Sequence, residues 1–105
     1  MPKATEHGEI WWARVDKWRP VVVVTRDDVR GARLKTTVAT VTRTSRGLPS
    51  EVSLDQRDGL PQPCVANCDD LGTISKARLI RRIGRLSEVK LMELSDALKF
   101  ALQLD

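Results

Sequence analysis

The sequence contains no tyrosine, one phenylalanine, one histidine and two cysteines. Because His7 is the only histidine, a catalytic pair of histidines is excluded. Cys64 and Cys68, with a single histidine far away in the sequence, do not supply the four ligands of a structural zinc site. We therefore expect two reduced thiols that are partly buried in the core, with a redox role as the alternative.

Long apolar runs and nucleotide-binding motifs are absent as well. No run approaches the roughly 18 to 20 apolar residues that span a bilayer, and residues 1–8 lack the apolar stretch of a signal peptide. There is no G-x-x-x-x-G-K-S/T loop and no G-x-G-x-x-G turn. These absences predict a cytoplasmic protein that makes no membrane contact and needs no metal or cofactor.

The composition that remains is typical of a small globular domain. The chain has 105 residues, of which 41% are hydrophobic and 30% are charged. This length fits one domain and lies near the lower limit for a self-sufficient core, so dimerisation would add useful burial. The net charge of +4 favours anionic partners, although charge alone is weak support for nucleic acid.

The hydrophobic pattern predicts several short strands followed by one helix. Ser75 is a candidate N-cap for a short helical turn, and Ser87 is one for an amphipathic C-terminal helix. Short strands with turn residues between them favour a small, strongly curved antiparallel barrel over a parallel sheet. The expected strands are 9–15, 21–24, 36–41, 51–54, 64–67 and 80–86, and the apolar face of the helix is Leu91, Leu94, Leu98, Ala101 and Leu102.

Residues 1–7 are polar and show no periodicity, so we expect a loose tail there and a single domain over 8–105. On this view His7 is a tail residue. Trp11 and Trp12 are adjacent in the first expected strand and should point to opposite faces of the sheet. One would enter the core, and the other would face a partner or ligand.

A cation and a hydroxyl stand beside two of the expected strands. Arg19 precedes Pro20 and a run of four valines, and Thr42 begins the basic, turn-rich loop 42–50. A guanidinium offers a planar fork of donors that matches phosphate oxygens, and a hydroxyl can add a further donor. We interpret the pair as a phosphate-binding site. The alternatives are that Arg19 is a surface charge and that Thr42 is an ordinary strand-end residue.

Five short motifs, in order and in spacing, resemble the MazF/PemK/Kid ribonuclease toxins of bacterial toxin–antitoxin pairs. The resemblance covers essentially residues 8–104. The motifs are Gly8-Glu9-Ile10-Trp11, Arg19-Pro20-Val21-Val22-Val23, Thr42 with Gly47-Leu48-Pro49-Ser50-Glu51-Val52, Cys68-Asp69 with Thr73-Ile74, and Ile83-Gly84-Arg85-Leu86.

The resemblance implies a mainly β fold with one helix, an SH3-like barrel of the CcdB/PemK type that forms a homodimer. It also implies metal-independent cleavage of single-stranded RNA that leaves a 2′,3′-cyclic phosphate and a 5′-hydroxyl, and inhibition by a MazE-like antitoxin. Carried over by position, the catalytic residues are Arg19, Thr42 and Asp69. Threonine is a poor base, so the proton acceptor stays open between Asp69, a water and an unusually placed arginine. For Asp69 a turn-forming role within 67–70 is the alternative.

The chain departs from the family pattern around the expected RNA channel. Only Asp16-Lys17-Trp18 fills the segment before Arg19, where relatives carry a longer loop, and Asn67 replaces a Kid-type arginine. Trp18 is therefore a candidate for stacking on a base, with an interface or core role as the alternative. Expected contacts to the RNA backbone come from Arg43 and Arg46, against the alternative of a solvated basic loop. Thr44 is a further candidate for substrate binding, and Asn67 could hydrogen-bond either a base edge or a phosphate.

Two non-catalytic readings compete with the nuclease. One is a CcdB-like inhibitor of a protein target such as gyrase, and the other is an SH3-like module that binds RNA without cutting it. Both predict that RNA stays intact in the presence of the protein.

Overall fold

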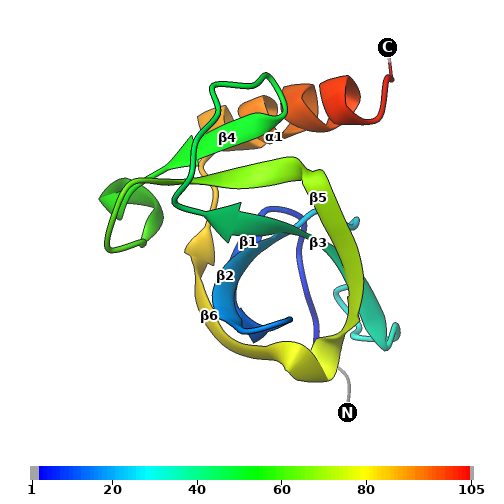
Figure 1. Cartoon of the computed structure of the whole chain (residues 1–105). Helices are drawn as coiled ribbons and strands as arrows, with labels where there is room; N and C mark the ends of the chain where they lie inside the picture. The colour runs from blue at the N-terminus through cyan, green and yellow to red at the C-terminus, as the bar shows by residue number, and fades with distance from the viewer. Residues whose placement is uncertain (1–2, 105) are drawn as a thin grey trace.

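The computed structural model describes residues 3–104 as one curled antiparallel sheet with a helix across one end (Figure 1). The strand order is β4-β5-β3-β2-β1-β6, so β4 and β6 are the edges. The elements are β1 (Glu9–Arg14), β2 (Trp18–Val23), β3 (Lys35–Thr42), β4 (Glu51–Leu54), β5 (Cys64–Ser75), β6 (Leu79–Arg85), two short 3-10 turns (Gln56–Asp58 and Lys76–Arg78) and α1 (Glu88–Ala101). The predicted fold class is confirmed.

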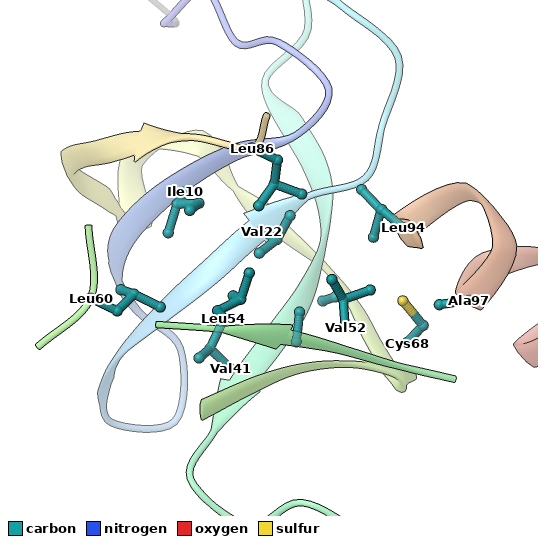
Figure 2. Packing of buried hydrophobic residues seen from close by; sticks show 12 residues of the cluster. Ile10, Val22, Val41, Val52, Leu54, Leu60, Cys68, Leu86, Leu94 and Ala97 are labelled. Atoms are coloured by element: carbon teal, nitrogen blue, oxygen red, sulfur yellow. The ribbon is translucent and has the colours of Figure 1, made fainter. Parts of the chain in front are cut away.

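The valine strand β2 is buried on both faces, as its composition predicts. Val22 belongs to a larger core cluster that reaches α1, whereas Val21 and Val23 belong to a second cluster with Trp11 and Leu79. Figure 2 shows side chains of the larger cluster converging from the strands toward Leu94 and Ala97 of the helix. The core therefore fixes the second half of β2 and leaves its first residues at the edge of the packed interior.

Strand β5 is much longer than the sequence suggested. It runs from Cys64 to Ser75, whereas the alternation of residue types predicted only 64–67. The pairing steps from Ala39 opposite Leu71 to Thr40 opposite Asn67, which leaves residues 68–70 in a bulge. The alternative of a turn at 67–70 is wrong, because these residues belong to the strand and form its bulge. The polar residues stay in the strand because Asp69 and Asp70 accept hydrogen bonds from hydroxyls of Ser50 and Thr40.

The C-terminal helix forms as its caps and periodicity predict. Ser87 is the N-cap, and its side chain accepts the N–H of Lys90. Leu94 and Ala97 are fully buried, and Leu102, expected on the apolar face, is instead 52% exposed beyond the last helical residue. Ser75 likewise caps the turn Lys76–Arg78. Within residues 3–104, no helix is long and apolar enough to cross a membrane.

The N-terminal segment is not loose over residues 3–7. Thr5 is 1% exposed and forms an antiparallel bridge with Asp28. Lys3 donates to the carbonyl of Lys76 and accepts, at its own carbonyl, from the Lys76 Nζ. The expectation fails because the partners of this polar segment lie far along the chain, where local periodicity carries no signal.

Candidate functional site

A pocket of about 490 Å³ opens where β2 begins and β3 ends. Val21 pairs with Thr40, and extending that register by two residues brings Arg19 opposite Thr42. The connection after β4 supplies the other wall. The lining residues are Trp12, Lys17, Trp18, Arg19, Pro20, Val41, Thr42, Arg43, Leu60, Pro61, Gln62 and Cys64.

Arg19 sits in this pocket with hydrogen-bonding capacity left over. Its Nε is buried and makes no hydrogen bond to any residue in 3–104. Its carboxylate contact with Asp16 is long: Nε lies 3.4 Å from Asp16 Oδ1, and Nη2 donates to Asp16 Oδ2 at 3.5 Å. The backbone N–H of Lys17 lowers the pKa of Asp16 and so keeps its carboxylate charged. Asp16 therefore orients the guanidinium without satisfying it.

Thr42 presents its hydroxyl in a defined way. Its Oγ1 accepts the backbone N–H of Thr44 at 3.3 Å. Because one lone pair is used, the O–H hydrogen remains available to donate. The site thus holds two kinds of donor, a guanidinium and a hydroxyl, that can converge on one anionic group.

The basic loop that follows Thr42 is held by a single carboxylate. Glu51 accepts the backbone N–H groups of Arg46, Gly47 and Leu48, and also the Ser45 hydroxyl. These donors, with Arg46 the strongest, lower the pKa of Glu51. Gly47 has a φ of 68°, a left-handed conformation that favours glycine. Glu51 therefore fixes the path of a loop whose Arg43, Thr44 and Arg46 are all exposed.

Asn67 and Asp69 do not line the pocket. The Asp69 carboxylate accepts from the Ser50 Oγ at 2.5 Å, and the Asp69 N–H donates to Asn67 Oδ1. Asn67 lies opposite Glu51 in the β4–β5 pairing. Of the predicted site residues, the structure brings together Trp18, Arg19, Thr42 and Arg43, and places Thr44, Arg46, Asn67 and Asp69 around the adjoining loop and bulge.

The two cysteines are free and belong to the core, as expected. Burial raises the pKa of Cys64, and it raises that of Cys68 to about 11. These shifts disfavour the thiolate form that would be needed for a redox role. Among residues 3–104, no three His, Cys, Asp or Glu side chains gather in a metal-binding arrangement.

Trp12 lines the pocket and Trp11 is buried, so the opposite-face prediction for this adjacent pair is confirmed. The roles of Asp16 and Gln62 at this site were not predicted from the sequence. The i,i+3 spacing of Asp16 and Arg19 was a usable local signal. Gln62 gave no signal, because its place in the pocket depends on how residues 55–63 fold back.

Comparisons with known proteins identify the family. The profile of the PemK-like, MazF-like toxins of type II toxin–antitoxin systems matches residues 6–102. Endoribonuclease MazF3 of Mycobacterium tuberculosis is 43% identical over 93 residues, covering 89% of this chain and 90% of that protein.

Solved structures with the same fold include proteins of this family. The Mycobacterium tuberculosis toxin MazF-mt6 superposes with a TM-score of 0.88 at 42% identity, covering 92% of this chain and 98% of its own. An endoribonuclease in complex with its cognate antitoxin, from a mycobacterial species, has the same fold with a TM-score of 0.84 at 20% identity, over 96% of this chain and 97% of its own. The chain belongs to the PemK-like, MazF-like toxin family of type II toxin–antitoxin systems.

Proposed function

We propose that this protein is the toxin of a toxin–antitoxin pair and that it cuts single-stranded RNA. The observation that carries the proposal is the pocket lined by both Arg19, which has an unsatisfied buried donor, and Thr42, whose hydroxyl hydrogen can still donate. The chain matches nine-tenths of the length of MazF3, a relative that is named an endoribonuclease. Cutting essential RNA would stop translation and growth.

In the proposed reaction the ribose 2′-oxygen attacks the adjacent phosphorus. A bond forms between O2′ and P, the bond from P to O5′ breaks, and the products are a 2′,3′-cyclic phosphate and a 5′-hydroxyl. Negative charge builds on the non-bridging oxygens as the attack proceeds. Arg19 offers two donors to those oxygens, and Thr42 donates a third hydrogen bond that holds the phosphate in line. This chain's own cation stabilises the charge, and the proposed reaction is metal-independent.

Proton transfer has no carboxylate among the residues that line the pocket. We propose that a water held there accepts the proton of the 2′-hydroxyl and that solvent water returns a proton to the departing 5′-oxygen, which gives the 5′-hydroxyl. A contribution from Asp69 stays a prediction, and within one chain its carboxylate is engaged with Ser50. Measuring the cleavage rate of Asp69→Asn tests that contribution.

RNA on either side of the cut would follow the exposed basic loop. We propose that Arg43 and Arg46 contact backbone phosphates, that Thr44 and Asn67 add hydrogen bonds, and that Trp18 stacks on a base. Such phosphate contacts position RNA without reading its sequence. They predict affinity that falls as salt rises.

The proposed assembly is a homodimer in the cytoplasm, inhibited by a MazE-like antitoxin that occupies the RNA channel. A mycobacterial endoribonuclease of the same fold has been solved with its cognate antitoxin. A basic pocket rim suits an acidic inhibitor segment, since opposite charge steers association. A monomeric mass by sedimentation at micromolar protein would defeat the dimer.

The experiment that tests the function is incubation of purified protein with a long single-stranded RNA in EDTA, followed by sequencing of the fragment ends. We expect cuts that carry cyclic-phosphate and 5′-hydroxyl ends. Intact RNA that is nevertheless retained in a salt-sensitive way would instead support a binding module. Intact, unbound RNA would support an inhibitor of a protein target.

A further inference from the structure

Two tryptophans form a stacked pair at the mouth of the pocket. The rings of Trp12 and Trp18 lie 6.4 Å apart between centroids and are inclined by 14°. Trp18 remains 48% exposed although it is adjacent to Arg19. The Trp18 ring is thus braced by a second ring and still about half exposed, which offers a flat, apolar partner a surface to pack on.

The pair is held by the strands themselves. In the β1–β2 pairing Trp12 lies opposite Pro20, and Trp18 lies opposite Arg14, so both rings stand on one face of the hairpin. Trp12 is half-buried and anchors the stack. Because Trp18 is already restrained, little conformational entropy is lost when a ligand stacks on it.

The facing wall of the pocket carries the hydrogen-bonding group that a flat ligand needs. Leu60 and Pro61 supply apolar surface, and Gln62 lines the same pocket with an amide that both donates and accepts. Glutamine can pair with the edge of a nucleobase through these two functions. The pocket therefore combines a stacking face, an edge-reading amide and, beside them, the cation Arg19.

We infer that Trp12, Trp18 and Gln62 form a nucleobase subsite next to the scissile phosphate. The inference rests on the proposed function and deepens it. A base of the bound RNA stacks on the exposed part of the Trp18 ring while Trp12 braces that ring. Every base has a stacking face, so Trp18 contributes affinity, whereas Gln62 sets which base is preferred at this position.

The test is a cycle that combines protein and RNA changes. The probe is a short mixed-sequence RNA carrying 2′-O-methyl groups throughout, which removes the attacking hydroxyl, and a set of copies each with one abasic position. For the unaltered protein we expect one abasic position to weaken binding by about 5- to 150-fold, the equivalent of losing one stacked base. For Trp18→Ala the same abasic position should have no further effect, because the stacking partner is already gone.

Three variants complete the design. Trp18→Phe should retain most of the affinity, and Leu34→Ala, a change of another exposed apolar side chain (70%) that does not line the pocket, should behave as the parent. Gln62→Ala should bind with little loss but should relax the base preference at the abasic-sensitive position. All variants are compared for thermal midpoint and sedimentation.

An equal abasic effect in the parent and in Trp18→Ala would overturn the inference, as would failure of the parent to bind the probe. A Trp18→Ala protein that loses the dimer would also overturn it, by assigning the ring to an interface. Cleavage of unmodified RNA is scored separately. A parent that shows the abasic cycle but never cuts RNA keeps the subsite and refutes the nuclease.

Discussion

The β2–β3 pair has a buried or half-buried cation near each end, and the two cations differ in how fully their hydrogen bonds are satisfied. Where β2 begins and β3 ends, Arg19 has a long contact with Asp16 and a buried Nε with no hydrogen bond inside 3–104. At the other end, near the start of β3, Lys76 is 2% exposed and donates to Asp28 at 2.5 Å and to the Lys3 carbonyl at 2.7 Å.

The Arg19 end is a candidate binding site, whereas the buried Lys76–Asp28 pair acts as a structural staple. Asp28 also accepts the N–H groups of Ala32 and Arg33, so its carboxylate is fully engaged. A satisfied buried pair of this kind ties distant segments together, and breaking it costs stability. The unsatisfied Arg19 is poised for an anion that comes from outside the chain. We therefore expect changes at one end to affect cleavage and changes at the other to affect folding.

The largest effect on catalysis is expected for Arg19→Ala. Losing a preorganised donor should lower the single-turnover cleavage rate by about 10² to 10³, with no fall in thermal midpoint. Arg19→Lys should recover only part of the rate, because an ammonium lacks the planar fork. Full activity in the lysine variant would show that charge alone suffices there.

Lys76→Met should give the converse result. It leaves the Asp28 carboxylate buried without its main partner, and we expect the thermal midpoint to fall by about 10 °C or more. The cleavage rate at a temperature where the variant is folded should match the parent. Calorimetry measures the thermal midpoint and a cleavage assay on the same preparation measures the rate. An unchanged midpoint would show that the Lys76–Asp28 pair does not stabilise the fold.

Thr42→Val should be less severe than loss of Arg19. Removing one hydrogen bond to a charged group should slow cleavage by about 10- to 150-fold. Thr42→Ser keeps the hydroxyl and should remain near the parent. Similar losses in both variants would point to the methyl group, and hence to packing, as the cause.

Acid should weaken the staple in a defined window. The hydrogen bond from Lys76 lowers the pKa of Asp28 to about 2 from an ordinary value of 3.8. A carboxylate with a depressed folded pKa stabilises the protein above its unfolded pKa, and this contribution is lost as the pH falls from about 4 toward 2. Urea titrations across that range should show a steeper loss for the parent than for Asp28→Asn.

Local patterns predicted most of the fold because its signals are local. The valine run of β2, the Ser87 cap and the spacing of Leu91, Leu94 and Leu98 all specify elements through neighbours a few residues away. The length of β5 was missed because its bulge depends on Ser50 and Thr40, which lie on other segments. Thr5 was missed for the same reason, since its bridge partner is Asp28.

The site residues also differ in whether a local signal predicts them. Arg19 and Thr42 could be proposed from their positions at strand ends, and the register brings them together. Gln62 could not, because only the folded connection after β4 places it in the pocket. Glu51 belongs to one of the five motifs. Its role in fixing the loop could not be predicted, because it depends on the backbone N–H groups of residues 46–48 pointing toward its carboxylate in the folded chain.

A double-mutant cycle between Arg19 and Thr42, measured as single-turnover cleavage of one RNA, tests the central claim most directly. If both side chains grip the same phosphate, the Arg19→Ala/Thr42→Val protein should be little slower than Arg19→Ala alone, because the second donor has lost its aligned target. Losses that simply multiply would show that the two residues act independently and would contradict the shared phosphate site.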